Sequence, residues 1–316
     1  MDSLDEALAA TPDGARVRSA RVKGGIATIV ADASGLDKAA QAALEAALRT
    51  AALGVTDVRD VRVALTAAQT GRIVIAVGSG KGGVGKSTVS ANLAIALARA
   101  GKRVGLIDAD IYGPSQPTLL GCDVKPEAKD DKLIPVAAQG IRFLSLGQLV
   151  SPGHALAWRG PMATGALGRL IDADWGDCDL LVVDLPPGTG DVQLSLIQKA
   201  RPAGAIVVST PQDLSLIDAR RAIDLFGKTS VPVLGIVENM AGYACPHCGE
   251  LSDPFGRGGA EAAAGELGVP FLGRLPLSRE LRAASDEGRP PSEGPDARYF
   301  AELAATLLAA LDTQQG

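Results

Sequence analysis

A glycine-rich run with two lysines carries the clearest chemistry in the sequence. Residues 80 to 88 read GKGGVGKST and satisfy G-x-x-x-x-G-K-[ST], directly between a predicted strand and a predicted helix. Glycines allow successive backbone N–H groups to face phosphate oxygens, and the helix adds the positive end of its dipole. We expect Lys86 to contact the β- and γ-phosphates of ATP and Ser87 to ligate Mg²⁺. The residues expected around the nucleotide are Gly80, Lys81, Gly82, Gly83, Val84, Gly85, Lys86, Ser87 and Thr88.

Aspartates follow two apolar runs that are typical of buried strands. Asp108 and Asp110 come after RVGLI, and Asp184 ends LLVVD. A carboxylate after the strand beside the phosphate loop is the expected Mg²⁺ partner, which suits Asp184. Asp108 and Asp110 are candidates for holding and polarising the attacking water, although aspartates that only cap a loop remain an alternative. Gly188, in the run PPGTGD, is a candidate donor of a backbone N–H to the γ-phosphate.

Two of the four cysteines lie close together, in the run CPHCG at residues 245 to 249. The C-x-x-C spacing of Cys245 and Cys248 lets two thiolates hold one edge of a metal centre, but a [4Fe–4S] cluster requires four ligands. A symmetric dimer would supply the other two. A dithiol redox pair, a Cys₄ zinc site between two chains and two unliganded thiols stay open as alternatives. Cys122 and Cys178 are expected to be small packing residues.

The elements that position these residues alternate between buried strands and helices from Arg72 onward. This alternation predicts an α/β fold with a doubly wound parallel sheet that binds ligands beyond the carboxyl ends of its strands. A terminal helix is expected around residues 297–312. Its apolar residues should pack on the core, because its polar face lacks the cations of a membrane-surface helix. The expected strands are RIVIAV at 72–77, RVGLID at 103–108, DLLVVD at 179–184, GAIVVSTP at 204–211, VLGIVENM at 233–240 and FLGRLP at 271–276.

The first 66 residues predict a small α/β domain of their own. Residues 17–32 read as two short strands around Gly24-Gly25, a hairpin signal, and residues 35–52 have leucines at helical spacing. An alternating segment after Gly54 predicts one more strand. We therefore expect domains at 1–66 and 72–316, with a linker at 66–71.

Composition limits the classes of partner. The 316 residues are 47% hydrophobic and only 3% aromatic, and the formal net charge of -5 disfavours a surface that binds nucleic acid. The acidic N-terminus lacks the basic start and apolar run of an export signal, and no stretch reaches the roughly 18 to 20 apolar residues that cross a bilayer. We expect a cytoplasmic protein that contacts neither membrane nor nucleic acid.

The KGGVGKST loop, with Lys81 as its extra lysine, resembles the deviant Walker A loop of the Min, Par, nitrogenase-iron-protein and Mrp groups of P-loop ATPases. The resemblance implies a homodimer in which Lys81 reaches the nucleotide of the partner subunit, where an added cation would stabilise the transition-state charge. It also implies that Asn239, in the run VENM, lies at the edge of the adenine.

Further motifs resemble the Mrp-type iron–sulfur cluster carriers within this group. They are DADIYGPSQP at 108–117, WRGPM at 158–162, DLPPGTGD at 184–191, STPQD at 209–213, VENM at 237–240 and CPHCG at 245–249. This resemblance covers about residues 72 to 291. It implies an ATPase that assembles a [4Fe–4S] cluster across a homodimer and transfers it to acceptor apoproteins, with iron–sulfur assembly proteins as further partners.

Residues 1–66 resemble, in their αββαβ pattern alone, the small iron–sulfur assembly domain often fused to such carriers. A Min- or Par-type positioning ATPase that acts as a switch on membrane or DNA is the alternative function for the whole chain, and an electron-transfer reductase is a second one.

Overall fold

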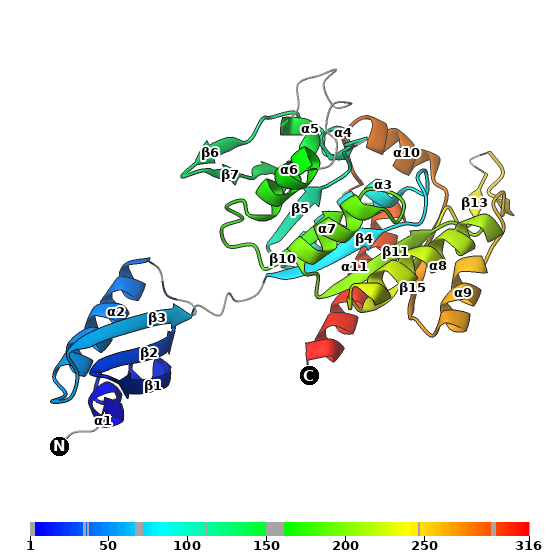
Figure 1. Ribbon diagram of the computed structural model, residues 1–316. Coiled ribbons are helices and arrows are strands. Elements are labelled where there is room, and N and C mark those ends of the chain that lie inside the picture. The colour runs from blue at the N-terminus through cyan, green and yellow to red at the C-terminus, as the bar shows by residue number, and fades with distance from the viewer. Residues whose placement is uncertain are drawn as a thin grey trace. The chain divides into compact units, whose positions relative to one another are not determined.

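The computed structural model describes residues 4–33, 36, 38–66, 72–111, 113–149, 161–245, 247–291 and 295–315 (Figure 1). The chain divides into two compact units, Met1–Arg72 and Ile73–Gly316. Of the sequence predictions, residues 67–71 of the linker and residues 158–160 of the WRGPM run lie outside the described residues.

The first unit is a three-stranded sheet with helices. Its strands have the order β1-β2-β3, with β1 antiparallel and β3 parallel to β2. The predicted hairpin is present as the antiparallel pair of β1 and β2, and Gly24 and Gly25 take positive φ angles of 60° and 81° at its turn. The elements are α1 (Leu4–Ala9), a 3₁₀ turn (Gly14–Arg16), β1 (Val17–Lys23), β2 (Ile26–Asp32), α2 (Lys38–Leu53) and β3 (Asp60–Thr66).

The second unit contains an eight-stranded sheet of order β15-β12-β11-β4-β10-β5-β9-β8. All neighbouring strands are parallel except β8 and β9, which are antiparallel. The six strands predicted from apolar runs are all present, and the strand that leads into the phosphate loop, β4, is central. The strands are β4 (Ile73–Gly78), β5 (Val104–Asp108), β8 (Val136–Ala138), β9 (Ile141–Ser145), β10 (Leu180–Asp184), β11 (Gly204–Ser209), β12 (Val233–Asn239) and β15 (Phe271–Leu275).

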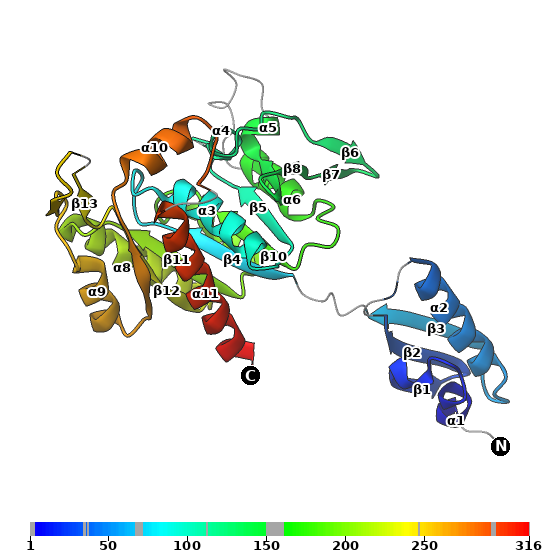
Figure 2. The same ribbon diagram turned by 180° about the vertical axis from the view of Figure 1, so that it is seen from behind.

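Helices cover both faces of this sheet, as Figures 1 and 2 show from opposite sides. One apolar cluster joins the sheet to α6, α7, α8 and α9, and a second cluster joins it to α3 and α11. The doubly wound α/β prediction is therefore confirmed. The helices are α3 (Lys86–Arg99), α4 (Gln116–Leu119), α5 (Leu146–Leu149), α6 (Pro161–Ile171), α7 (Asp191–Ala200), α8 (Asp213–Lys228), α9 (Gly259–Leu267), α10 (Arg279–Asp286) and α11 (Pro295–Gln315).

The segment between α4 and α5 contains strands that the sequence did not predict. Besides β8 and β9 it forms a hairpin, β6 (Glu127–Lys129) with β7 (Lys132–Ile134). Four of these pieces lie within residues 127–145, and three have only three residues, too few for an alternating apolar pattern to emerge.

The terminal helix α11 packs on the core, as predicted. Its residues Phe300, Leu303, Leu307 and Leu311 are at most 3% exposed and belong to the cluster that contains α3. No helix among the described residues is long and apolar enough to cross a membrane. The packing roles predicted for two cysteines are confirmed as well, since Cys178 is buried in one cluster and Cys122 packs against the other.

Candidate functional site

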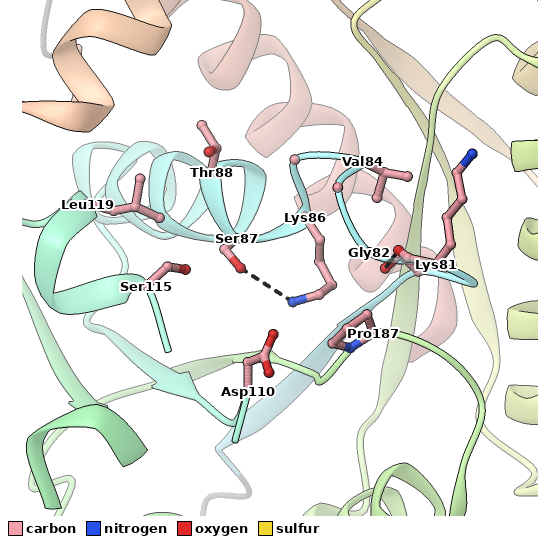
Figure 3. A pocket seen from close by; sticks show the side chains of 13 residues that line it. Lys81, Gly82, Val84, Lys86, Ser87, Thr88, Asp110, Ser115, Leu119 and Pro187 are labelled. Carbon is pink, nitrogen blue, oxygen red and sulfur yellow. Dashed lines mark hydrogen bonds between the residues drawn. The ribbon is translucent and has the colours of Figure 1, made fainter. Parts of the chain in front are cut away.

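The glycine-rich loop connects β4 to α3 and lines a pocket of about 240 Å³ (Figure 3). The pocket lies at the carboxyl end of the central strand, where an open α/β sheet binds its ligands. The second wall comes from the segment after β5 and from the segment after β10. The lining residues are Ser79, Lys81, Gly82, Gly83, Val84, Gly85, Lys86, Ser87, Thr88, Asp110, Ser115, Leu119 and Pro187.

Two glycines show why the loop needs these residue types. Gly85 precedes α3 with φ of 79°, a left-handed conformation that L residues other than glycine rarely adopt. Gly80 lies against α8, and a Cβ at this position would be 2.0 Å from the carbonyl oxygen of Asp218. The loop conformation therefore depends on glycine for its dihedral angles in one place and for close backbone contact in the other.

Lys86 and Asp184 form a buried ion pair beside the pocket. The Lys86 ammonium lies 2.5 Å from Asp184 Oδ1, with side chains 6% and 0% exposed, and 3.5 Å from Ser87 Oγ. Asp184 also accepts hydrogen bonds from Ser90 and from Gln116, each at 3.0 Å. Since β10 pairs with β4, the carboxylate stands directly beside the phosphate loop and holds the Lys86 ammonium there.

The structure separates the two aspartates that follow β5. Asp108 is completely buried behind the pocket and accepts hydrogen bonds from the backbone of Asp110 and Gln116 and from the hydroxyl of Ser145, at 3.2, 3.0 and 2.8 Å. Asp110 lines the pocket and lies below Lys86 in Figure 3. Of the two candidates for contact with an attacking water, the geometry therefore favours Asp110, whereas Asp108 supports the loop from behind.

Burial makes the carboxyl group of Asp108 an unusually weak acid. Removal from water, and next the negative charge of Asp184, raise the pKa of Asp108 to about 7, although its three hydrogen bonds act in the opposite direction. An unfolded aspartate has a pKa of about 3.9. Between these values the folded protein keeps a proton that the unfolded chain has released. This group therefore lowers the free energy of unfolding as the pH rises from about 4 to about 7.

We expect Asp108→Asn to remove this pH dependence. As the pH rises through that window, the unfolding free energy of the variant minus that of the wild type should increase by up to about 1.4 kcal/mol for each pH unit. The measurement is urea unfolding of both nucleotide-free proteins at intervals between pH 4 and pH 8. If the unfolding free energies of the two proteins changed with pH in parallel, the raised pKa of Asp108 would be contradicted.

Lys81 behaves differently from Lys86. Its side chain is half-buried and points away from the Lys86 ammonium in Figure 3. Within the described part of the chain, no carboxylate lies within ion-pair distance of it. The contact of Lys81 with the nucleotide of a partner subunit remains a prediction.

Two residues that were predicted to contact the nucleotide form hydrogen bonds within the protein instead. The backbone N–H of Gly188 donates to the carbonyl oxygen of Ser79 at 3.2 Å rather than facing the pocket. The side-chain amide of Asn239, 7% exposed, donates to the carbonyl oxygen of Val84 at 2.8 Å. The γ-phosphate contact of Gly188 and the adenine contact of Asn239 remain predictions.

The two buried carboxylates accept hydrogen bonds from side chains for which the sequence predicted no role, namely Gln116, Ser90 and Ser145. The Gln116 amide bridges Asp184 and the carbonyl of Ser87, each at 3.0 Å. Gln116 stands inside the DADIYGPSQP run, so the run itself was the available signal. Ser90 and Ser145 gave none, because a serine in a helix or strand is ordinary until folding places a carboxylate beside it.

The oxygen donors around the pocket suit Mg²⁺. Ser87 and Asp110 line it, and hydroxyl and carboxylate oxygens are the ligands that this ion takes. Ser115 Oγ, from another lining residue, is buried without a hydrogen-bond partner among the described residues. A nucleotide or the water shell of an ion would satisfy it. Both oxygens of Asp184 already accept protein donors, so this carboxylate fits a contact through bound water.

Cys245 and Cys248 lie on a short hairpin between β13 (Tyr243–Ala244) and β14 (Leu251–Ser252). Cys245 is half-buried and Cys248 is exposed. The backbone N–H groups of Cys248 and His247 donate to the Cys245 thiol and lower its pKa, and the Cys248 side chain adds a smaller effect. Such donors stabilise a thiolate, the form that binds metals. The pair does not open a helix, as a dithiol redox motif would.

The comparison with known protein families decides the classification. The profile of the family described as ParA: NUBPL iron-transfer P-loop NTPase matches residues 71–310. The chain belongs to this family. The predicted resemblance to iron–sulfur cluster carriers within the P-loop ATPases is thereby confirmed.

Individual proteins with similar sequences or structures support the membership of this chain in the NUBPL family. An iron-sulfur cluster carrier protein of Pseudomonas fragi is 48% identical over 241 residues, 74% of this chain and 84% of that protein. One from Deinococcus radiodurans is 50% identical over 259 residues, 78% of this chain and 73% of that protein. A solved nucleotide-binding protein from Archaeoglobus fulgidus in complex with ADP shares 42% identity and a TM-score of 0.63, over 72% of this chain and 91% of that one.

Proposed function

We propose that the protein is an ATP-hydrolysing carrier that assembles a [4Fe–4S] cluster across a homodimer and transfers it to acceptor apoproteins. The observation that carries the proposal is the presence, in one unit, of a phosphate loop with a spare lysine and of a thiol pair that supplies half of a cluster site. Both features are incomplete in one chain, and a two-fold axis completes both.

The cluster is the cargo, and Cys245 and Cys248 of each subunit are its proposed ligands. Among the described residues, no group of three or more histidine, cysteine, aspartate or glutamate side chains could hold a metal. Two thiolates leave a [4Fe–4S] cluster two ligands short. The exposed Cys248 side chain permits a second hairpin to approach, and the same two residues of the partner subunit would complete the four ligands.

The hydrolysis of ATP to ADP and phosphate is assigned to the pocket residues. Lys86 neutralises charge on the β- and γ-phosphates, and Asp110 orients the attacking water. Mg²⁺, held by Ser87 with Asp184 behind it, would neutralise further phosphate charge when bound. Lys81 of the opposite subunit would add a cation to the γ-phosphate. Dimer formation and hydrolysis are thereby linked.

The partners that fit this function are acceptor apoproteins and iron–sulfur assembly proteins in the cytoplasm. The net charge of -5 supports a protein that does not bind nucleic acid. The burial of the apolar residues of α11 supports a helix that packs on the core rather than on a membrane. We assign cluster and nucleotide chemistry to residues 72–316, and we assign residues 1–66 to a separate assembly-type domain.

The test is anaerobic reconstitution of the wild type and of Cys245→Ala/Cys248→Ala with iron and sulfide. We expect iron and acid-labile sulfide on a dimer of 32.1-kDa chains in the wild type and neither in the variant. The matched control is Cys122→Ala/Cys178→Ala, which removes two packing thiols and should still bind the cluster. Zinc alone in the wild type, or equal iron in all three proteins, would refute the carrier function. Sedimentation provides the oligomeric state.

A further inference from the structure

Asn239 joins the phosphate loop to the segment that carries the cysteines. It is the last residue of β12, and its amide donates to the carbonyl oxygen of Val84 at 2.8 Å, although 155 residues separate the two in sequence. Val84 is 2% exposed and immediately precedes Gly85 and Lys86. The hydrogen bond is therefore buried, and it holds the part of the loop that turns toward the phosphates.

Met240 lies against the same turn. A Cβ on Gly85 would be 2.3 Å from the Asn239 amide nitrogen and 3.6 Å from Met240 Cε, so both side chains lie directly over the Gly85 backbone. Met240 has a φ of 61°, a left-handed conformation that is uncommon for residues with a side chain. Such strain persists where the surrounding structure fixes the residue, and here the fixed position is next to the loop.

Hydrogen bonds follow the chain from this contact to the cysteines. The backbone N–H of Ala241 donates to Leu275 at 3.0 Å, and Gly242 accepts from Leu277 at 2.8 Å. The strand β13 then begins at Tyr243, and the N–H of Cys245 donates to Glu250 at 2.9 Å across the hairpin. Only five residues stand between Asn239 and Cys245, and backbone hydrogen bonds hold the segment at Ala241, at Gly242 and in the hairpin.

We propose that Asn239 and Met240 are positioning residues that couple the nucleotide state of the loop to the exposure of Cys245 and Cys248. The proposal rests on the proposed function and names its regulation. A loop that closes around phosphates shifts the Val84 carbonyl, and the packed side chains over Gly85 must move with it. Because the segment beyond them is held by hydrogen bonds, the displacement reaches the hairpin instead of dissipating in a loose linker.

The test measures alkylation of the cluster-free full-length protein by iodoacetamide, with each cysteine followed by mass spectrometry. Saturating Mg²⁺–ADP is compared with a saturating non-hydrolysable Mg²⁺–ATP analogue, after the Kd of each is determined for every variant. In the wild type we expect the rates at Cys245 and Cys248 to differ between the two nucleotides by about fivefold or more. Asn239→Ala should bring this ratio close to one.

The matched control is Asn92→Ala. Asn92 is also buried, at 4% exposure, and its amide donates to the carbonyl of Thr88 in the helix that follows the loop, at 2.9 Å. The substitution removes an amide-to-carbonyl hydrogen bond within α3 and leaves the hydrogen bond between Asn239 and Val84 in place. We expect it to keep the wild-type ratio, since loss of a buried amide is not in itself the cause.

Met240→Ala provides a second variant, which decides the matter if Asn239→Ala fails to bind nucleotide. It should reduce the ratio while leaving both Kd values unchanged. The proposal would be overturned if nucleotide-saturated Asn239→Ala or Met240→Ala kept the same alkylation ratio as the wild type. It would also be overturned if the wild-type protein itself gave a ratio of one. In either case, normal iron and sulfide binding in the reconstitution would show that the carrier function survives.

Discussion

Lys86→Ala should lower the rate of ATP hydrolysis by at least about a thousandfold. The side chain of Lys86 is 6% exposed and lines the pocket beside Ser87, so it would act on phosphate charge in surroundings with little water. A cation in such a place stabilises developing charge far more than one in bulk solvent. Steady-state phosphate release and nucleotide Kd, measured together, separate a loss of chemistry from a loss of binding.

The same substitution should destabilise the fold. Without Lys86, the buried Asp184 has no cationic partner among the described residues, and the neighbouring side chain of Asp108 is buried as well. Removing one partner of a buried ion pair costs about 3–5 kcal/mol. Urea unfolding measures this cost, and a variant that unfolds like the wild type would show that the pair contributes nothing to stability.

Lys81→Ala is the matched control within the same loop. Lys81 is half-buried and has no ion pair in the part of the chain that the structure describes. We expect its unfolding free energy to stay within about 0.5 kcal/mol of the wild type, because the substitution breaks no ion pair among the described residues and leaves no cavity in the core. Hydrolysis should nevertheless fall, and only under conditions where the protein dimerises. A Lys86→Ala protein with wild-type hydrolysis would refute the assignment of the phosphate site.

Gly80→Ala should be the most damaging small substitution in the loop. The added Cβ would lie 2.0 Å from the carbonyl oxygen and 2.2 Å from the carbonyl carbon of Asp218, both main-chain atoms of α8. Main-chain atoms cannot rotate away as the end of a side chain can. The loop and the helix must therefore separate. Overpacking usually costs about 1–3 kcal/mol, and we expect about 4 kcal/mol or more here.

Gly82→Ala tests whether the damage comes from the contact rather than from the loop in general. A Cβ on Gly82 would meet nothing closer than Pro187 at 3.9 Å, and the φ of this residue lies outside the left-handed range. We expect its urea midpoint to remain near the wild-type value, whereas that of Gly80→Ala falls. Equal destabilisation by the two substitutions would contradict the close packing of Gly80 against α8.

The sequence alone determined the features that depend on short-range pattern. The GKGGVGKST run predicted a phosphate loop, because glycine permits the required dihedral angles, and the apolar run before it predicted the strand that leads into the loop. The carboxylates of Asp108, Asp110 and Asp184 were predicted at strand ends. The spacing of Cys245 and Cys248 predicted a two-ligand edge. Each of these follows from residue type and from neighbours a few positions away.

Only the tertiary structure decided which groups act on one another. It placed Asp110 in the pocket and Asp108 behind it, although both follow the same strand. It also showed that the Asn239 amide donates a hydrogen bond to Val84 and that the Gln116 amide donates one to Asp184. Gly188 donates to Ser79 because β10 and β4 are neighbouring parallel strands, and the segments that follow them lie together. These partners lie between 68 and 155 positions apart, so the packing of helices against the sheet brings them together, and no local pattern records it.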